Sequence, residues 1–406
     1  MLDFPKLRNG LQAIPIEQQG QRLILLRDSL GYAPDSLLIP MKLAVILMQM
    51  NGENSLRDLQ AHYVRMTGNL LYMENLEDMV KKLDENLCLD NERFRRLLVR
   101  EINEFREDPI RRMQHAGNSY PVDPSLLRFK LDGFFTGLPG YQRAESKSGN
   151  QLVALMAPHI DLNAGGVCFA HAYQAASAAN PPATWVVLGT GHEPVENYFA
   201  LTLKDFETPL GLMLCDQDYG SKLLRRSPRD ILAGEYHHRK EHTIEFQALF
   251  LAHSQPSSRI VPLLCSFGLE EWEVDRFYID EMAGLIRNLA LEKGPAAVGF
   301  IASVDLAHIG PRYGDPFSPN AGTVQEHLHA DAELLRSLGK CSARDFMQLI
   351  SRERNRRRVC GMAPLYVLAK ILEGLAEGEI LEHTHAIVDH QNSFVTFASM
   401  AFYAQS

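Results

Sequence analysis

The sequence predicts an α/β protein with a largely parallel or mixed central sheet, helices on both faces of that sheet, and a small, mainly helical amino-terminal domain. Two observations predict this class. Continuous apolar runs alternate with helical patterns from about Gln151 onwards, and the first hundred or so residues show helical spacing alone. The chain has 406 residues, 46% of them hydrophobic, which is long for a single domain. We therefore expect two domains, at residues 1–110 and 111–406.

The strands are expected in the carboxyl-terminal domain. Uninterrupted apolar runs, typical of strands buried on both faces, occupy residues 152–157, 185–190, 259–265 and 297–304. Helical patterns separate these runs at residues 167–179, 245–253 and 272–291. Repeated strand–helix units favour a parallel sheet. The segments 383–390 and 393–403 are rich in β-branched and aromatic residues, so we expect them to add further strands.

The amino-terminal domain shows apolar residues three and four positions apart in residues 40–52, 55–66 and 75–89. Each segment opens with Pro, Ser or Asn, which are residues that begin helices. We predict three short amphipathic helices there, followed by a charged linker helix within residues 93–113. Their order resembles a small winged-helix-like module of the PqqD type. Acids and bases are nearly balanced in this region, which lacks the basic footprint of a DNA-binding module, so we expect it to dock onto a protein or peptide.

Composition and charge exclude several classes of function. The net charge is −9 and the isoelectric point about 5.9, so we expect no nucleic-acid partner. No segment resembles a signal peptide or a membrane span, and we expect a cytoplasmic protein with no membrane partner. The six cysteines lack CxxC spacing and are expected to be reduced and mostly buried. The sequence also lacks the motifs of serine hydrolases, P-loop proteins and zincins.

Three histidines occupy the same position relative to predicted strands. His159, His192 and His308 each follow an apolar run by a few residues. Ligands of open α/β sheets bind beyond the carboxyl ends of the strands, so we expect these imidazoles to meet there. Two or three histidines with a carboxylate and open coordination positions suit Fe(II), Zn(II) or Cu(II). The sequence therefore predicts a mononuclear divalent-metal site.

Two carboxylates and a further histidine are candidates for acid–base chemistry. His242 and Glu245 are expected on one face of a helix that begins near Glu241, where the carboxylate can orient the imidazole. An earlier start of that helix would instead let His238 and His242 chelate a metal together. Asp305 follows a strand and is expected to be a metal ligand, a carboxylate that orients a ligand, or a turn former. The candidate catalytic residues are thus His242, Glu245 and Asp305.

A series of segments resembles the Memo family in order and spacing. They are HAGNSYP at 115–121, APHIDLNAGGVCFAHAY, VVLGTGH, FETPLG, EHTIEFQ, IVPLLC, SVDLAHIGPRYGD and VCGMAPL at 359–365. The resemblance implies a fold like that of class III extradiol dioxygenases, with a metal site above the sheet. It also implies that the chain is component B of an AmmeMemoRadiSam system, whose other members are a radical-SAM enzyme and an AMMECR-type protein.

The resemblance also implies roles for single residues. His159 and His192 match the metal-binding histidines of the family, and His242 matches a histidine that lines the same pocket. The cysteine of the family's SSDFCH segment, taken as a third ligand in animal members, falls on Ala307. The third ligand is therefore left to His308, Asp305, His242 or water.

These implications lead to a metal-dependent oxidoreductase that acts on a small molecule or a peptide. Fe(II) is the expected metal, with Cu or Zn as alternatives, and His242 or His308 is expected to move the proton. Two other functions stay open at this point. One is a metal-dependent hydrolase that uses the same ligands to activate water. The other is a non-catalytic metal- or peptide-binding protein that recruits the radical-SAM enzyme.

Overall fold

The computed structural model describes residues 3–28, 31–34, 36–138, 151–177, 182–294 and 296–405. The chain divides into two compact units, Met1–Glu107 and Asp108–Ser406. Each unit buries its own apolar core. The predicted domain boundary, after residue 110, lies close to this division.

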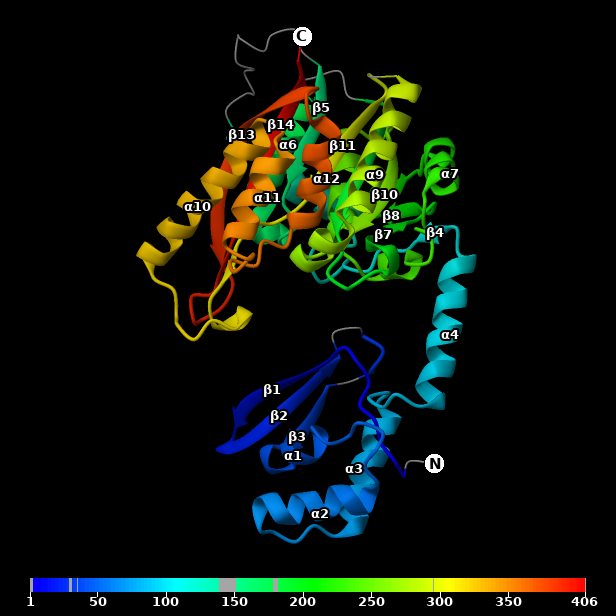
Figure 1. Cartoon of the computed structure of the whole chain (residues 1–406), viewed down its shortest axis with the longest axis vertical. Helices are drawn as coiled ribbons and strands as arrows, with labels where there is room; N and C mark the ends of the chain where they lie inside the picture. Colours follow the sequence, from blue (N-terminus) through cyan, green and yellow to red (C-terminus); the bar gives the residue numbers. More distant parts are fainter. Residues whose placement is uncertain are drawn as a thin grey trace. The chain divides into compact units, whose positions relative to one another are not determined.

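The amino-terminal unit combines helices with a small antiparallel sheet. The sheet consists of β1 (Leu11–Gln18), β2 (Gln21–Asp28) and β3 (Leu37–Pro40), paired in that order (Figure 1). The helices are α1 (Ala44–Leu47), α2 (Leu56–Thr67), α3 (Met73–Glu85) and α4 (Glu92–Glu107). The sequence predicted helices here but not the sheet, because β1 is mostly exposed and shows little alternation of apolar and polar residues.

Local signals fix the ends of α2. The Ser55 side chain accepts from the backbone N–H of Asp58, whose carboxylate in turn accepts from the backbone of Ser55. This reciprocal capping satisfies backbone donors that the first helical turn leaves free. Gly68 ends the helix with a φ of 69°, a conformation that glycine adopts without strain. The buried faces of α2 and α3 contribute Leu59, Tyr63, Leu76, Val80 and Leu83 to the core that also contains Ile24 and Ile39 of the sheet.

The carboxyl-terminal unit is built on one large mixed sheet. Its central strands β5 (Leu152–Ala157), β11 (Val298–Ser303), β6 (Thr184–Thr190) and β10 (Arg259–Cys265) are parallel neighbours in that order. Antiparallel strands extend both sides: β7 (Phe199–Leu201) pairs with β10, and β14 (Phe394–Ala404) pairs with β5. β13 (Ala376–Ile387) and β12 (His308–Ile309) pair with β14. The predicted parallel or mixed sheet is thus confirmed.

Helices cover both faces of this sheet because successive residues of the buried strands point to opposite sides. Val186 and Leu188 of β6 belong to one core, whereas Val187 belongs to the other. The first core receives α7 (Gln217–Arg226), α9 (Leu269–Lys293), α10 (Ala321–Gly339), α11 (Ala343–Arg352) and α12 (Met362–Leu372). The second receives α5 (Pro124–Phe135), α6 (Leu162–Ser177) and α8 (Thr243–Ser254). Residues 178 and 179, predicted to continue α6, lie outside the described residues.

A small second sheet borders the unit where the chain enters it. β4 (Ile110–Arg111) pairs in parallel with β8 (Asp205–Thr208), which pairs with β9 (Gly211–Met213). β8 and β9 also contact α8. The first residues of the carboxyl-terminal unit are thereby held beside the amino-terminal end of α8, which carries a predicted site residue.

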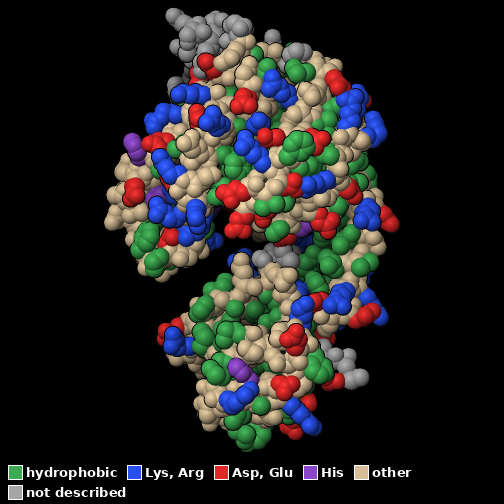
Figure 2. All heavy atoms as spheres, in the orientation of Figure 1, with side chains coloured by type: hydrophobic (Ala, Val, Ile, Leu, Met, Phe, Trp, Pro, Cys, Tyr) green, Lys and Arg blue, Asp and Glu red, His purple; other side chains and the backbone are tan. Residues whose placement is uncertain are grey.

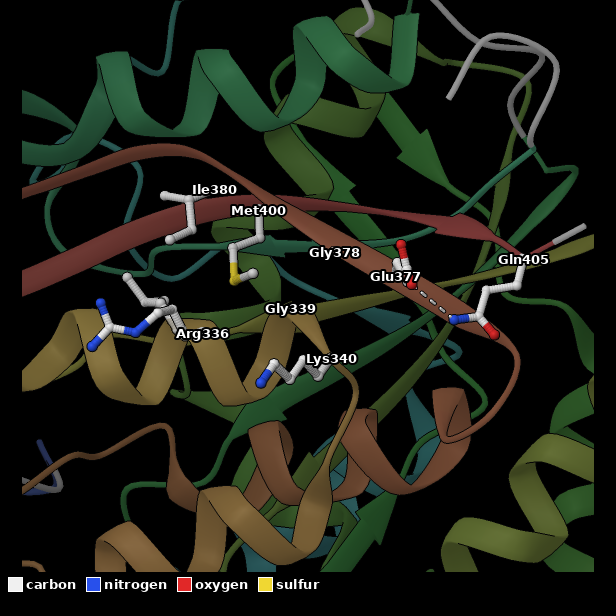
Figure 3. Close-up of a pocket in the computed structure, with 9 residues that line it drawn as sticks. Arg336, Gly339, Lys340, Glu377, Gly378, Ile380, Met400 and Gln405 are labelled. Carbon is white, nitrogen blue, oxygen red and sulfur yellow. Dashed lines mark hydrogen bonds between the residues drawn. The ribbon is translucent and has the colours of Figure 1, made fainter. Parts of the chain in front are cut away.

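α10 approaches β13, the strand that pairs with β14, closely. An added Cβ on Gly339 would lie 3.1 Å from the carbonyl oxygen of Gly378, so the helix meets the strand backbone to backbone. A hollow of about 450 Å³ lies along this contact, lined by Arg336, Lys340 and Met400 among others (Figure 3). Arg336 stands in the last turn of α10 and Lys340 is its C-cap residue, so both cations interact favourably with the helix dipole.

Among the described residues, no helix is long and apolar enough to cross a membrane. The cysteines carry no disulfide; Cys360 is partly exposed and the others are buried. The expectation of reduced, mostly buried thiols is therefore confirmed.

Candidate metal centre

Three adjacent strands deliver polar side chains to one edge of the large sheet. β5 leads to His159, β6 leads to His192, and β11 ends at Ser303, just before Asp305. Since β5, β11 and β6 are parallel neighbours, their carboxyl ends meet at this edge. The amino-terminal end of α8 reaches the same place and brings His242, its N-cap residue.

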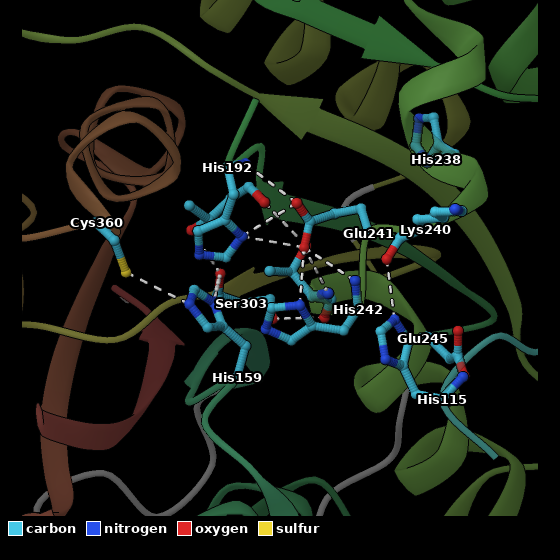
Figure 4. A network of polar contacts seen from close by, with 12 residues as sticks. His115, His159, His192, His238, Lys240, Glu241, His242, Glu245, Ser303 and Cys360 are labelled. Carbon is cyan, nitrogen blue, oxygen red and sulfur yellow. Dashed lines mark hydrogen bonds and ion pairs between the residues drawn. The ribbon is translucent and has the colours of Figure 1, made fainter. Parts of the chain in front are cut away.

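His159, His192 and His242 form one compact group (Figure 4). Each offers a ligand atom, and these atoms all lie within 4.8 Å of one another. The ring centroids are 5.0 Å apart for His159 and His192, 5.4 Å for His159 and His242, and 5.1 Å for His192 and His242. In the part of the chain that the structure describes, this is the group that could hold a metal ion. It includes two of the predicted ligands and, in place of His308, the predicted acid–base residue His242.

The hydrogen bond of His159 fixes its tautomer. Its Nδ1 lies 3.0 Å from the backbone carbonyl oxygen of Ser303. Because a carbonyl oxygen can only accept, Nδ1 carries the hydrogen and Nε2 keeps a free lone pair. Metal-binding histidines are commonly held by this kind of bond. Burial lowers the pKa of His159 well below its usual value, and the charges of His192 and His242 add to the effect, so the ring is neutral.

Glu241 holds the other two imidazoles. Nδ1 of His192 lies 3.1 Å from each carboxylate oxygen, and Nδ1 of His242 lies 3.2 Å from Oε1. The backbone N–H groups of His192, His242 and Thr243 also donate to the carboxylate, at 3.0, 2.9 and 3.2 Å. Burial alone would raise the pKa of Glu241, but the hydrogen bonds from the two histidines hold it well below its usual value. The carboxylate therefore directs both Nε2 atoms away from itself, towards His159.

Glu241 was not predicted from the sequence. The signal was available, because an acidic residue directly before a helix commonly caps its first turn. The prediction instead paired His242 with Glu245, which requires His242 to lie inside the helix.

Cys360 also lies beside the three-histidine group, and it was not predicted from the sequence. Its Sγ lies 3.4 Å from Nε2 of His159, on the side opposite His242 in Figure 4. Burial raises the pKa of the Cys360 thiol, and its hydrogen bond to His192 opposes that rise. Gly361 explains the position: an added Cβ would lie 2.9 Å from the carbonyl oxygen of Asp305, so only a residue without a side chain lets the start of α12 approach so closely. Ala307 stands at the position of the family's cysteine, and a thiol is supplied here by Cys360, just before α12.

Asp305 contacts both the backbone and the ring of His159. Its Oδ1 accepts from the backbone N–H groups of His159 and Ile160, at 3.0 and 3.2 Å, and its Oδ2 lies 3.5 Å from Nε2 of His159. Burial raises the pKa of this carboxyl group, against the lowering effects of His308 and the backbone donors. The geometry agrees with one of the three predicted roles, that of a carboxylate which positions a ligand.

Glu245 does not contact His242 by any hydrogen bond found among the described residues. It forms a fully buried ion pair with Arg111 and accepts from the hydroxyl of Tyr120 and the backbone N–H of His115. The pKa of Glu245 is lowered: burial would raise it, but the positive charge of Arg111 and the hydrogen bond from Tyr120 outweigh that effect. The predicted pairing of His242 with Glu245 is therefore not the one that the geometry shows.

His308 and His238 lie outside the three-histidine group. His308 Nδ1 donates to the carbonyl oxygen of Leu306 at 3.0 Å, and its ring packs edge-on against Tyr313. Burial lowers the pKa of His308, against the opposing charge of Asp305. His238 is fully buried with its Nε2 2.8 Å from the carbonyl oxygen of Ala200, and burial lowers its pKa to about 3. His238 is thus a structural residue.

The group suits a metal ion. Metal–nitrogen bonds of about 2.0–2.1 Å keep two ligand nitrogens within about 4.2 Å of each other, and the present separations need little contraction to reach that. His159 is buried, whereas the side chains of His192 and His242 are 39% and 30% exposed. The group is therefore closed on the His159 side and open to solvent on the other, which leaves room for a substrate.

The fold and this group define an α/β protein with a candidate metal centre at the carboxyl ends of its parallel strands. The chain belongs to the Memo-like protein family, which matches residues 111–401. That match spans the carboxyl-terminal unit and the histidine group.

Individual relatives extend this finding. A MEMO1 family protein of Aquifex aeolicus is 27% identical over 392 residues, covering 96% of this chain and 98% of the relative. A MEMO1 family protein of Thermus thermophilus is 26% identical, covering 81% of this chain and 93% of the relative. One of Methanosarcina barkeri is 26% identical and covers 70% of this chain but 97% of its own length. Similarity to the Aquifex protein thus extends into the amino-terminal unit. The Methanosarcina protein is shorter than this chain and cannot match it over its full length.

Proposed function

We propose that this Memo family protein is a non-haem metal-dependent oxidoreductase related to class III extradiol dioxygenases. One observation carries the proposal: His159, His192 and His242 each have Nδ1 engaged by a fixed acceptor and offer ligand atoms that all lie within 4.8 Å of one another. Three imidazoles around an open position suit a divalent transition metal. When bound, the metal supplies Lewis-acid and redox chemistry at the solvent-facing side of the group.

The remaining residues would prepare the site for that chemistry. Glu241 contributes one negative charge beside two imidazoles, which favours a cation between them. Cys360 offers a soft sulfur donor next to Nε2 of His159. Asp305 holds the backbone of the loop that carries His159. Each therefore acts on the position or the electronic character of a metal ligand.

His308 is the better candidate to move a proton. His242 belongs to the compact group, so its Nε2 would be occupied by the metal. His308 carries its hydrogen on Nδ1, bonded to the carbonyl oxygen of Leu306, and its pKa is lowered by burial. Its Nε2 is therefore unprotonated near neutral pH and can accept a proton from a bound substrate hydroxyl.

We propose Fe(II) as the metal, with Cu and Zn as the alternatives, and an oxygen-bearing small molecule or peptide as the substrate. Oxygen consumption tests the reaction class: anaerobically purified protein, loaded with each metal in turn, is mixed with catechol-type compounds in air-saturated buffer. Metal-dependent oxygen uptake that His308→Ala reduces by about 10²-fold or more supports the proposal. Hydrolysis of an ester without oxygen uptake would favour a metal-dependent hydrolase instead. Stoichiometric metal without turnover of either kind would favour a non-catalytic binding protein.

We further propose that the amino-terminal unit docks the radical-SAM enzyme, with an AMMECR-type protein as the third component. Hydrophobic side chains lie on the surface of this unit (Figure 2). The exposed ones include Met48 at 73%, Leu70 at 70% and Tyr72 at 65%. Capture of the radical-SAM enzyme by the full chain, lost when these three residues are changed to Ser, would support the docking role. Equal capture by the parent and the variant would refute it.

A further inference from the structure

Arg111 stands at the start of the carboxyl-terminal unit, yet its side chain reaches the segment that carries Glu241 and His242. Its Nε donates to the carbonyl oxygen of His238 at 2.9 Å, and its Nη2 donates to the carbonyl oxygen of Glu241 at 2.8 Å. Its Nη1 forms the buried ion pair with Glu245 and also donates to the carbonyl oxygen of Arg112. The guanidinium is fully buried. One side chain thus binds residues 238, 241 and 245 at once.

The neighbouring residues strengthen the same attachment. His115 lies beside Glu245 in Figure 4, and its backbone N–H donates to that carboxylate at 2.9 Å. Its Nε2 donates to the carbonyl oxygen of Lys240 at 2.9 Å, and its ring centroid lies 5.6 Å from that of His242. Residues 111–115 therefore hold the carbonyl groups of residues 238, 240 and 241 in sequence.

This arrangement acts on backbone that no regular element fixes. The chain between the short helical turn Glu235–Arg239 and the start of α8 at Thr243 contains both Glu241 and His242. The carbonyl oxygens of His238, Lys240 and Glu241 each receive a hydrogen bond from a side chain of residues 111–115. The orientation of the Glu241 carboxylate, and with it the Nδ1–H bonds of His192 and His242, depends on this backbone.

We propose that Arg111 is a positioning residue of the metal centre, which sets the geometry of His192 and His242 through the backbone of residues 238–241. The planar fork of an arginine suits this task, because it presents donors in several fixed directions, whereas a lysine offers one compact ammonium group. Arg111→Lys keeps the charge opposite Glu245 but cannot reach all three attachment points. This inference rests on the proposed metal site and names a residue that touches neither the metal nor its ligands.

The chain offers a closely matched control. Arg8 in the amino-terminal unit is also buried, pairs with the carboxylate of Asp28 at 2.6 Å, and donates to the carbonyl oxygens of Leu87 and Asn9. Arg8→Lys therefore makes the same chemical change to the same kind of environment in the other unit. Both variants are compared in the full chain, after circular dichroism and urea unfolding have shown that each is folded.

The probe is Co²⁺, whose visible absorption reports the geometry of its ligands. We expect Arg111→Lys to weaken Co²⁺ binding about 10- to 100-fold, the usual effect of losing a residue that orients metal ligands, and to change the absorption bands. Arg8→Lys should leave both unchanged. Parent-like affinity and bands in Arg111→Lys would overturn the proposal.

A second readout separates this proposal from the metal site itself. Heteronuclear NMR of the histidine side chains in metal-free protein reports which ring nitrogen carries the hydrogen. We expect the Nδ1–H form of His242 in the parent and a changed resonance for His242, but not for His159, in Arg111→Lys. If the parent binds no Co²⁺, the proposed metal site fails, and the NMR comparison still decides the role of Arg111: unchanged His242 resonances would refute it.

Discussion

Replacing Glu241 with glutamine tests the shared carboxylate with almost no change of shape. In the structure Oε2 accepts from the backbone N–H and from Nδ1 of His192, at 3.0 and 3.1 Å. Oε1 accepts from Nδ1 of His192 at 3.1 Å, and also from His242 and the backbone N–H of Thr243. An amide can replace only one oxygen by NH₂, and in either orientation that group faces at least two N–H donors. The preferred orientation puts NH₂ in the place of Oε2, so the backbone N–H of His192 loses its acceptor and Nδ1 of His192 keeps only its bond to Oε1.

The size of the effect follows from these lost bonds. A buried donor without a partner costs about 1–3 kcal/mol, and the donor that loses its acceptor belongs to the partly exposed His192, so we expect Glu241→Gln to lower the free energy of unfolding by about 1 kcal/mol. The loss of an orienting partner weakens metal binding about 10- to 100-fold, which corresponds to about 1.4–2.7 kcal/mol. Urea unfolding measures the first quantity, and Co²⁺ titration against a competing chelator measures the second.

Glu235→Gln is the matched control for this experiment. Glu235 is another mostly buried glutamate of the same segment, and it accepts from the hydroxyl of Thr202 rather than from a histidine. Its replacement should leave metal affinity unchanged. If Glu241→Gln binds Co²⁺ as tightly as Glu235→Gln does, Glu241 does not orient the imidazoles and the reasoning is refuted.

Two further predictions concern the fold. Gly378→Ala should destabilise the protein by about 1–3 kcal/mol, because the added Cβ would lie 2.6 Å from the ring of Phe402; an unchanged urea midpoint would show that β13 can move. Asp216 is bonded to Lys293, and although burial raises its pKa, the hydrogen bonds of Lys293 and Thr184 lower it below the usual 3.8. The stability from this pair is therefore complete above about pH 4 and lost as the pH falls through the lowered pKa. The difference in unfolding free energy between parent and Asp216→Asn should shrink in that acid range; a constant difference down to pH 2 would contradict the shift.

The large sheet could be predicted because its strands are buried on both faces. Such strands must be apolar throughout, so β5, β6, β10 and β11 stand out as continuous runs. The amino-terminal sheet could not be found in this way. Its first strand is largely exposed, and the pairing with β2 is stabilised by backbone hydrogen bonds that leave little trace in the sequence.

The same distinction applies to the site. His159 and His192 could be predicted because the carboxyl ends of adjacent parallel strands must meet. His242 was assigned to the pocket, but its partner could not be: Glu241 and Glu245 both lie near the ring in sequence, and only the exact start of α8 decides which carboxylate faces it. Cys360 comes from the start of α12, and its approach depends on the tertiary contact of Gly361 with the loop after β11.

The central claim is that one metal ion is held by the three-histidine group, and metal content tests it most directly. Three proteins are purified anaerobically, loaded with Fe(II) and desalted: the parent, His159→Ala and His192→Ala. Their metal content is then measured by inductively coupled plasma mass spectrometry. His329→Ala, a change at an exposed histidine of α10, is the control. We predict about one metal ion per chain in the parent and the control, and loss of that ion in both site variants. Absence of metal from the parent under all loading conditions, or full metal content in both site variants, would contradict the claim.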